Sequence, residues 1–391
     1  MNPILKALGR RLRLGVIGGG PGSFIGPVHR TAAKLDDRFE IVAGVLSSHS
    51  GRSRAAAVAI GIDPDRAYSD WRAMLKMERA RGDGVDAVAV MTPNDSHAAI
   101  CTAALDRGFD VICDKPLTTS LDDALQLVAK VAATGRVFCL TYNYTAYPMV
   151  RQARDMVAAG EIGEVRQIEL TYIQGHNAEL VETEPARRTW RFDPASCGPS
   201  LILGDIGTHA HHLGAFVSGQ ELDAVMAEVW ASVPGRASDD SAHVLMRWSG
   251  GARGTMWVTN AAAGGVHGLA FRIYGAKGGL EWHQEEPNEL RHRRQGGFDQ
   301  ILTRGLHGAL SASAVRACRI EVGHPEGYQE AFANLYKDVA EVIVARQLGL
   351  EPDPLALDFP SVLDGAKGVA MIEACVESAA SGRWVSARLP G

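Results

Sequence analysis

Residues 12–26 of the chain are LRLGVIGGGPGSFIG, an apolar run that ends in a cluster of glycines. A short, continuous apolar run is typical of a strand that is buried on both faces of a parallel sheet. The glycines after it allow the backbone to turn tightly and to approach a pyrophosphate, whose charge then meets the amides of a helix N-terminus. The order of strand, glycine turn and helix therefore predicts a dinucleotide-binding turn.

This turn supplies the first candidate binding residues. The spacing from Gly20 to Gly26 is longer than in the usual fingerprint, which indicates an insertion in the turn. The expected contacts with the dinucleotide are Gly18, Gly20, Ser23, Phe24 and Ile25. The alternative is a glycine-rich loop that holds no ligand.

Strands and helices alternate through the first part of the chain. Similar apolar runs occupy residues 39–46, 85–91, 109–113 and 137–142. Helix-like segments between them cover residues 27–35, 50–60, 70–80, 96–107 and 120–133. This alternation predicts a doubly wound α/β Rossmann domain over residues 1–145.

The pattern changes after residue 145. Strand-like segments cover residues 164–174, 222–233, 241–249, 252–260, 269–275 and 278–283, and helix-like segments cover 147–158, 326–348 and 361–381. Several strands are separated only by a short turn, which requires antiparallel pairing. We therefore expect residues 146–391 to form an α+β domain for substrate binding and oligomerisation, with a large, mainly antiparallel sheet. Residues 176–200 and 284–322 are expected to be irregular, as long functional loops often are.

The end of the second expected strand bears on the choice of cofactor. An acidic residue there would normally contact the adenosine ribose. This chain has Ser47 and Ser48 at that place, and Arg52 and Arg54 follow in the next helix. The arginines could contact a 2′-phosphate, or they could lie at an exposed helix start, so these residues leave both NAD and NADP open.

The composition argues against several classes of partner. The 391 residues include 40 Lys and Arg and 45 Asp and Glu, a net charge of −5, so nucleic acid is not an expected partner. We find neither an apolar run of about 18 residues nor the apolar stretch of a secretory signal. The 6 cysteines are scattered, without CxxC spacing, which fits reduced thiols. We expect a soluble cytoplasmic protein without a membrane partner.

Four stretches carry a family resemblance. They are Met91–His97 (MTPNDSH), Cys113–Leu117 (CDKPL), Gly204–His209 (GDIGTH) and Tyr274–Trp282 (YGAKGGLEW). In this order and at these distances, the chain resembles the Gfo/Idh/MocA family of oxidoreductases over nearly its whole length. The resemblance implies a bound nicotinamide dinucleotide and a substrate pocket between the Rossmann strand ends and the sheet. It also implies hydride transfer from a secondary hydroxyl of a sugar or cyclitol to NAD(P), which gives the keto product.

The resemblance assigns roles to individual positions. Lys115, Asp205 and His209 correspond to catalytic positions of the family. The positions that correspond to cofactor neighbours are Thr92, Pro93, Asn94, His97, Asp114 and Lys115. Asp114 departs from the family's glutamate and is one methylene shorter. The family's Lys-Pro motif also predicts a cis peptide between Lys115 and Pro116.

Further pieces narrow the resemblance to inositol and unusual-sugar dehydrogenases. They are Gly22–Arg30 (GSFIGPVHR), Trp190–Phe192 (WRF) and Gly323–Gly327 (GHPEG). The leading expected substrate is scyllo-inositol or a related inositol or sugar. The expected substrate contacts are Lys115, Tyr144, Arg191, Asp205, His209 and His324. For Arg191 and His324, the alternative is a buried polar network without a ligand.

The residue chemistry suits the oxidation of an alcohol, which needs a hydride acceptor and a proton acceptor. Free imidazole titrates near about 6.5, so His209 suits the role of base. Asp205 lies four residues earlier, which on a helix would put both side chains on one face. Lys115 follows an expected Rossmann strand, where its ammonium can stabilise the developing alkoxide. The alternatives are a surface lysine, a helix N-terminal carboxylate and a core histidine.

His211 and His212 suggest a metal site together with His209. On a regular helix, however, three histidines within four residues cannot all face one ion. We therefore expect no metal.

Two other functions and one assembly state stay open. The chain could be a redox-neutral enzyme that retains NAD while it processes a glycoside, or a dinucleotide-binding sensor without turnover. The first would require a further acid–base pair or a metal. The strands between residues 222 and 283 offer more sheet face than two helices can cover, which predicts a homo-oligomer, either a tetramer or a dimer.

Overall fold

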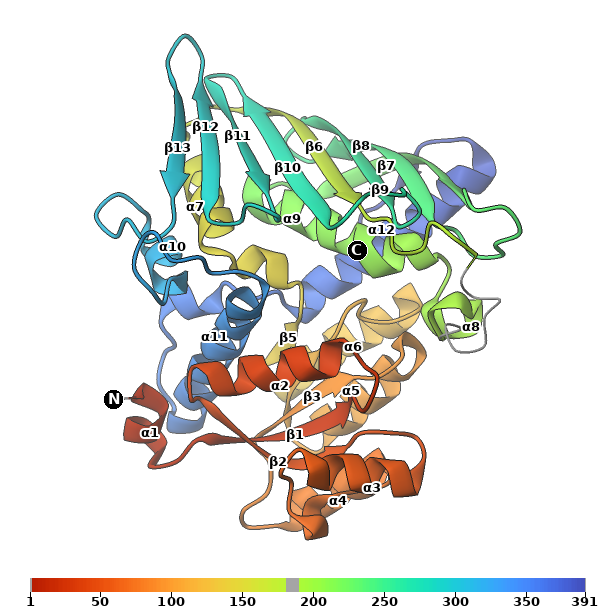
Figure 1. The fold of residues 1–391 in the computed structure, drawn as a ribbon, viewed down its shortest axis with the longest axis vertical. Helices are drawn as coiled ribbons and strands as arrows, with labels where there is room; N and C mark the ends of the chain where they lie inside the picture. The colour runs from red at the N-terminus through yellow and green to blue at the C-terminus, as the bar shows by residue number, and fades with distance from the viewer. Residues whose placement is uncertain (1, 181–189, 391) are drawn as a thin grey trace. The chain divides into compact units, whose positions relative to one another are not determined.

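The computed structural model describes residues 2–180 and 190–390. The chain divides into two compact units, each with its own sheet (Figure 1). The first unit consists of Met1–Thr118, Asp122–Asn143 and Tyr328–Leu363, and the second of Thr119–Leu121, Tyr144–Gly327 and Asp364–Gly391.

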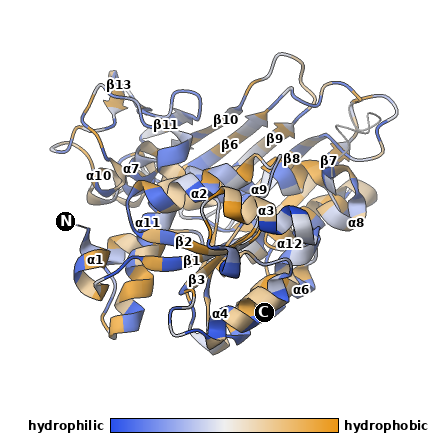
Figure 2. Cartoon of the chain, turned by 60° about the horizontal axis from the view of Figure 1, so that its bottom comes forward, coloured by the Kyte–Doolittle hydropathy of each residue, from blue (hydrophilic) through white to orange (hydrophobic). Residues whose placement is uncertain are grey.

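The first unit is built on a five-stranded parallel sheet in the order β2-β1-β3-β4-β5. The strands are β1 Leu12–Gly18, β2 Phe39–Val45, β3 Ala87–Met91, β4 Asp110–Cys113 and β5 Phe138–Leu140. The helices are α1 Pro3–Leu8, α2 Ile25–Leu35, α3 Ser50–Ala59, α4 Trp71–Ala80, α5 His97–Asp106 and α6 Leu121–Thr134. All residues of β3 and β4 are buried, and hydrophobic residues dominate the central strands (Figure 2). The predicted Rossmann fold is confirmed.

Helix α11, Tyr328–Leu348, belongs to the first unit although it follows the strands of the second unit in sequence. It packs against α2, where Gln329 Nε2 donates to the carbonyl of Val28 at 2.9 Å. The rings of Phe332 and His29 also lie 4.8 Å apart. The boundary at residue 145 that the sequence predicts assigns this helix to the second domain. The order of elements along the chain does not show which unit a C-terminal helix packs against.

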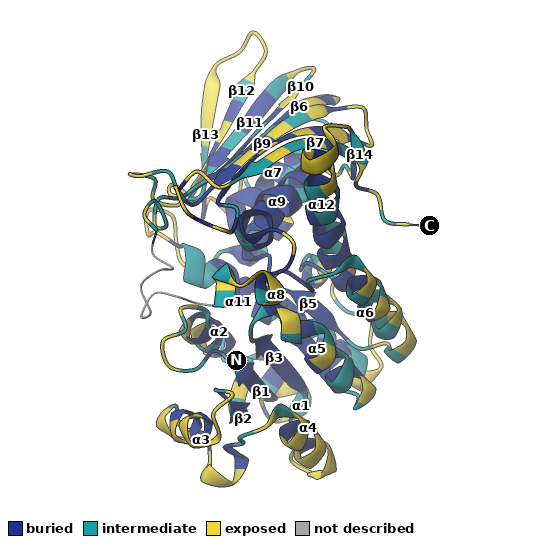
Figure 3. Ribbon diagram, turned by 90° about the vertical axis from the view of Figure 1, so that its right-hand side faces the viewer, coloured by how far each residue is buried: buried dark blue, intermediate teal, exposed yellow. Residues whose placement is uncertain are grey.

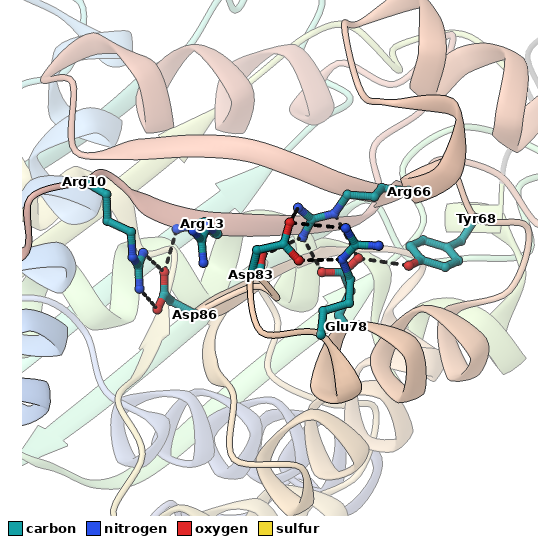
Figure 4. Close-up of polar contacts among 8 residues, drawn as sticks. Arg10, Arg13, Arg66, Tyr68, Glu78, Asp83 and Asp86 are labelled. Carbon is teal, nitrogen blue, oxygen red and sulfur yellow. Dashed lines mark hydrogen bonds and ion pairs between the residues drawn. The ribbon is translucent and has the colours of Figure 1, made fainter.

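Arg66 and Glu78 form a buried ion pair in the first unit (Figure 4). Glu78 accepts hydrogen bonds from Arg66 and, at 2.9 Å, from the hydroxyl of Tyr68. The pKa of Tyr68 is raised to about 12, mainly because the hydroxyl is partly buried and in addition because it donates a hydrogen bond to Glu78. The Ser53 hydroxyl then links this segment to β2, since it donates to Tyr68 O and accepts from Leu46 N. The turn after β2 is thereby fixed.

The second unit contains a nine-stranded sheet in the order β13-β12-β11-β10-β6-β9-β8-β7-β14 (Figure 1). The strands are β6 Val165–Ile173, β7 Leu222–Trp230, β8 Ser241–Trp248, β9 Arg253–Thr259, β10 Gly268–Gly275, β11 Gly278–His283, β12 Glu289–Arg294, β13 Asp299–Thr303 and β14 Val385–Ser386. Every neighbouring pair is antiparallel except β6 and β9, which run parallel. The predicted large, mainly antiparallel sheet is confirmed.

Residues 284–322, predicted to be irregular, contain two strands and a helix. β12 and β13 form an antiparallel hairpin, and α10 spans Ala312–Ala317. The prediction was wrong because β12 has the sequence ELRHRR, in which charged side chains alternate with only two buried ones, Leu290 and His292. A mostly charged strand next to the edge of the sheet lacks the apolar run that marks the central strands.

One face of the nine-stranded sheet is covered by helices. α7, Pro148–Ala158, packs on β11 and β12, and α9, Thr208–Ser218, packs on β6 and β10. Burial alternates strictly along β8 from Val244 to Trp248, as expected for a sheet with one open face. Figure 3 shows buried and exposed residues mixed along the strands of this sheet. The exposed apolar side chains of the strands are Met226, Leu245, Trp257, Tyr274 and Ile301.

Candidate active site

The glycine turn after β1 packs too closely for side chains. Gly18 and Gly19 have φ values of 89° and 66°, which favour glycine. A Cβ on Gly20 would collide with the carbonyl oxygen of Leu46. Arg30 Nη1 donates to the carbonyl of Gly19 at 2.7 Å and fastens the turn to α2.

The first turn of α2 carries the residues predicted to bind the pyrophosphate. The helix begins at Ile25, and its N-cap residue, Phe24, makes no side-chain cap hydrogen bond. Ser23 Oγ accepts a hydrogen bond from Gly26 N at 3.2 Å, and Phe24 is 73% exposed. Open backbone amides at the start of an α-helix carry partial positive charge and bind phosphate groups. These residues fit the pyrophosphate of a dinucleotide.

The turn after β2 carries the residues expected beside the adenosine ribose. Ser47 Oγ accepts from the backbone N–H of His49 at 3.2 Å, so it shapes the turn into α3. Ser48 and Arg52 are exposed. A ribose here would meet hydroxyls in place of a carboxylate, and Arg52 supplies a nearby cation.

His97 ties two loops together at the carboxyl edge of the parallel sheet. Its ring nitrogens lie 3.0 Å from the carbonyl of Thr92 and 2.9 Å from that of Pro116. The imidazole is fully buried, so it holds the loop of Thr92, Pro93 and Asn94 against the loop of Lys115. The structure therefore gives His97 a supporting position behind the expected cofactor neighbours.

Asp114 and Lys115 follow β4 directly. Asp114 Oδ1 accepts from Thr141 Oγ1 at 2.9 Å and from Lys115 N at 3.0 Å. These bonds fix the backbone from which the Lys115 side chain extends. The peptide bond between Lys115 and Pro116 is cis, which confirms that prediction.

In the second unit, Asp205 lies in a π-helical turn, Leu203–Gly207, that leads into α9. Such single turns occur frequently at functional sites. Asp239 fixes its start, because its carboxylate accepts from the backbone N–H of Leu201 and Ile202. Asp205 therefore precedes His209 through a widened turn and not along a regular α-helix.

His209 is buried against tyrosine rings. Its ring lies 4.8 Å from that of Tyr144, nearly perpendicular at 84°. Asp205 contributes to the raised pKa of the Tyr144 hydroxyl, which is due mainly to burial. Arg191 Nε lies 3.9 Å from Asp205 Oδ1, and its guanidinium lies over the ring of Trp190. The second unit thus brings together four of the predicted site residues.

His324 has a different setting. Its side chain is exposed on a turn, and its backbone carbonyl accepts a hydrogen bond from the buried Arg304. Arg304 also donates to the carbonyls of Ile320 and Glu321, at 2.7 and 3.0 Å. These hydrogen bonds from the buried Arg304 side chain fix the backbone of the turn that carries His324.

His211 and His212 point away from a shared ion. His211 stacks on Trp248 at 6.2 Å, and burial lowers its pKa to about 3. His212 lies 3.9 Å from Asp364, and burial lowers its pKa as well. Within residues 2–180 and 190–390, no three His, Cys, Asp or Glu side chains are grouped to hold a metal.

Tyr172, Gln174 and His267 lie beside this cluster and are absent from the sequence-based site. The Tyr172 hydroxyl is 2.5 Å from that of Tyr144. The available signal was the alternation of Tyr172, on β6, with Gln174, just after the end of that strand, but an aromatic residue in a strand usually packs in the core.

Comparison with known proteins agrees with this architecture. Residues 12–142 match the family described as "Oxidoreductase family, NAD-binding Rossmann fold", and residues 150–281 match "GFO/IDH/MocA C-terminal domain". The oxidoreductase YfiI of Bacillus subtilis is 35% identical over 388 residues, which covers 97% of this chain and 98% of the relative. Levoglucosan dehydrogenase of Pseudarthrobacter phenanthrenivorans is 26% identical over 410 residues, 96% of this chain and 98% of that protein.

Solved structures show the same fold. The crystal structure of an inositol dehydrogenase homologue from Azotobacter vinelandii in complex with NAD+ has a TM-score of 0.92 and 39% identity, and covers 96% of this chain and 97% of that one. Its complex with NADH and myo-inositol has a TM-score of 0.89 and 38% identity, with coverage of 97% and 98%.

No helix among the described residues is long and apolar enough to cross a membrane.

Proposed function

Because the chain belongs to the Gfo/Idh/MocA family of oxidoreductases, whose N-terminal domain is an NAD-binding Rossmann fold, we propose that it oxidises a secondary hydroxyl of a cyclitol or pyranose sugar to a ketone. The observation that carries the proposal is the cluster of His209, Tyr144, Asp205 and Arg191 in the second unit, where the His209 and Tyr144 rings are buried and Arg191 is exposed. Such a cluster suits a ligand with several hydroxyls, each of which both donates and accepts hydrogen bonds.

The proposed roles follow from the chemistry of the side chains. The bound nicotinamide supplies the hydride acceptor. The imidazole of His209 takes the hydroxyl proton, and the ammonium of Lys115 stabilises the negative charge that develops on oxygen. Asp205 orients His209 or accepts a hydrogen bond from a neighbouring hydroxyl. Arg191 places a positive charge 3.9 Å from the Asp205 carboxylate.

The proposed binding of the cofactor uses the residues of the first unit. The amides of Phe24 and Ile25 at the start of α2, together with the Ser23 hydroxyl, would hold the pyrophosphate, beside the close-packed Gly18 and Gly20. The amide of Ser23 itself donates to the carbonyl of Gly20. The remaining proposed contacts, from three loops at the strand ends, are Ser47, Ser48, Arg52, Thr92, Pro93, Asn94, Asp114 and Lys115. His97, which was expected among them, is buried and supports two of these loops.

We propose scyllo-inositol, or a related inositol or unusual sugar, as the substrate, with Tyr144, Arg191 and His324 among its contacts. Support comes from the motifs that the chain shares with inositol dehydrogenases and from the myo-inositol complex of the Azotobacter homologue. We propose NAD as the preferred cofactor, because that homologue and levoglucosan dehydrogenase were both crystallised with NAD+ or NADH.

A substrate screen tests the proposal. Inositols and sugars are incubated with the enzyme and either NAD or NADP, and the absorbance of the reduced nicotinamide is followed. We expect the highest kcat/KM for an inositol or closely related sugar with NAD. A higher kcat/KM with NADP would overturn the cofactor preference, and no turnover with any polyol would overturn the function.

A redox-neutral glycoside-processing enzyme and a sensor without turnover are not favoured. Two of the relatives, levoglucosan dehydrogenase and inositol 2-dehydrogenase, are dehydrogenases. The first alternative also requires an acid–base pair or a metal beyond the cluster described above. Product analysis with a glycoside would separate it from a dehydrogenase.

We also propose that the chain forms a homo-oligomer through the open face of its nine-stranded sheet. Trp257 and Leu245 are 43% and 49% exposed on adjacent strands there. Exposed apolar side chains on a sheet face favour its burial against a second copy of the same face.

A further inference from the structure

The loop between β7 and β8, residues 231–240, begins with a tight turn in the second unit. The turn has the sequence Val233-Pro234-Gly235-Arg236. Arg236 N donates to the carbonyl of Val233 at 3.2 Å, and Gly235 has a φ of 83°. Proline at the second position and a glycine with positive φ at the third favour such a turn. Arg236, at the end of the turn, is buried.

Asp240 closes the loop with a buried carboxylate. It accepts from the backbone N–H groups of Ser232 and Val233 at 2.8 and 3.1 Å, and from Arg236 Nη1 at 3.0 Å. The side chains of Arg236 and Asp240 are each 1% exposed. Burial opposes ionisation of Asp240, but the hydrogen bonds outweigh it and hold the pKa of this carboxyl below its usual value. The ionised carboxylate therefore holds Arg236 in place.

Arg236 reaches from the loop to the segment that carries Arg191. Its Nη2 donates to the carbonyl of Glu179 at 2.7 Å, and its guanidinium lies over the ring of Phe192, 5.8 Å from the ring centre. Ser238 Oγ also donates to the carbonyl of Phe192 at 3.4 Å. Phe192 is the residue next to Arg191, so these contacts fix the backbone from which Arg191 extends.

The same loop holds the turn that carries Asp205. The carboxylate of Asp239 accepts from the backbone N–H groups of Leu201 and Ile202, at 3.2 and 2.7 Å. The π-helical turn Leu203–Gly207 begins directly after these residues. Neighbouring residues of one loop thus anchor the backbones of both Arg191 and Asp205.

The pair of Arg191 and Asp205 depends on this support. The two groups lie 3.9 Å apart, and the Arg191 side chain is 46% exposed. The attraction in such an exposed pair is weak, because ordering a long side chain costs entropy and water screens the charges. Their relative position therefore depends on the backbones that the loop anchors.

We propose that Arg236 and Asp239 are positioning residues for the polyol: Arg236 places Arg191, and Asp239 places Asp205. The inference rests on the proposed function, in which Arg191 and Asp205 contact substrate hydroxyls. Because the loop sets the separation of these two charged groups, it also sets which pattern of hydroxyls fits between them.

The test begins with Arg236→Lys. Lysine keeps a positive charge beside Asp240 but lacks the planar fork that reaches Glu179 and Phe192. We expect KM for the best polyol to rise about tenfold, roughly the value of one hydrogen bond. The change in kcat should be smaller, and the affinity for NADH, measured by fluorescence titration, should not change.

Asp239→Asn tests the other half of the pair. It replaces one of the two acceptor oxygens with a donor, which faces the backbone N–H groups of Leu201 and Ile202. We expect the looser turn to lower kcat/KM for the polyol by about tenfold as well.

Double variants separate positioning from a purely structural role. In an Arg191→Gln background, Arg236→Lys should raise KM no further, because its effect passes through Arg191. In an Asp205→Asn background, Asp239→Asn should likewise add nothing. Binding of the polyol to the NADH complex gives the same comparison where turnover is slow. Losses that multiply in either double variant, or normal kinetics in either single variant, would overturn the inference.

The matched control is Arg154→Lys on α7. Arg154 makes the same two kinds of contact, since its guanidinium lies 4.8 Å from the ring centre of Phe216 and 2.8 Å from Asp155. KM and kcat should not change in this variant. Absence of polyol turnover in the parent enzyme would instead overturn the proposed function.

Phe192→Leu applies if Arg236→Lys folds poorly. It leaves the buried pair of Arg236 and Asp240 intact and removes the ring on which the guanidinium lies. KM for the polyol should rise in the parent and stay constant in the Arg191→Gln background. An unchanged KM in the parent, or an equal rise in both backgrounds, would contradict the role of Arg236.

Discussion

At the scale of single residues, the identity of the proton acceptor is the sharpest question. General-base assistance is typically worth about 10²–10⁴-fold. His209→Ala should therefore lose about two to four orders of magnitude in kcat and retain cofactor binding, because the lost interaction is made mainly in the transition state. Lys115→Met should be at least as damaging, and Asp205→Asn should be milder. Steady-state kinetics with the best polyol checks the order.

The matched control for these variants is His243→Ala. His243 is exposed on β8 between the rings of Trp230 and Trp257. Its removal should leave kcat unchanged. Near-normal kcat in His209→Ala, or an unchanged acidic limb in its pH profile, would assign the base to Lys115 and leave His209 to position the substrate.

Buried histidines also make stability depend on pH. Burial lowers the pKa of His211 from 6.5 to about 3. Below about pH 6.5 the unfolded chain binds this proton and the folded chain does not, so stability falls as pH falls, by about 1.4 kcal/mol per pH unit. Urea unfolding between about pH 7 and pH 5 should show a smaller loss for His211→Phe than for the parent. Equal losses would show that His211 does not titrate differently on folding.

Some residues of the site can be recognised from the sequence, and others cannot. Lys115, Asp205 and His209 occur in short motifs, so their positions can be proposed from sequence. Tyr172 and Gln174 cannot, because only the pairing of β6 with its neighbours shows that they adjoin Tyr144 and His267.

At the scale of elements, the turn that carries His324 depends on one buried ion pair. Arg304 and Glu326 are each 2% exposed and 2.8 Å apart. Arg304→Met leaves the Glu326 carboxylate without its cation and should reduce the free energy of unfolding by about 3–5 kcal/mol. Arg304→Met combined with Glu326→Gln should be milder, since the buried charge is gone. Denaturant unfolding measures both, and a double variant as unstable as the single one would contradict this explanation.

Elements are predictable where their residue pattern is set by burial. β1 and β3 are continuous apolar runs because helices cover both faces of the parallel sheet. β12 could not be predicted from its residue pattern because it lies near the sheet edge and is mostly charged. The π-helical turn at Asp205 could not be predicted either, since a widened turn has no residue pattern that distinguishes it from an α-helix.

At the scale of the whole molecule, the open sheet face predicts assembly. Trp257→Lys places a charge at its centre and should shift the protein toward monomers, because the ammonium would have to be desolvated in the interface. Light scattering at several concentrations measures this. Met77→Lys on α4, also an exposed apolar residue, is the control and should not change the mass. A parent that is monomeric at all concentrations would contradict the proposed interface.

The two-sheet organisation could be predicted from the sequence, but the membership of α11 could not. That helix returns to the first unit after the whole second sheet, and its contacts with α2 are long-range. Sequence order carries no information about such a return.

The central claim is that hydride passes from a polyol carbon to the nicotinamide. The most direct measurement uses scyllo-inositol, or the best substrate from the screen, with deuterium on its hydroxyl-bearing carbons, followed by mass spectrometry of the reduced cofactor. The account predicts one deuterium per NADH formed and a ketone in equal amount. Turnover that leaves NAD oxidised, with the deuterium retained in the product or exchanged to solvent, would contradict it.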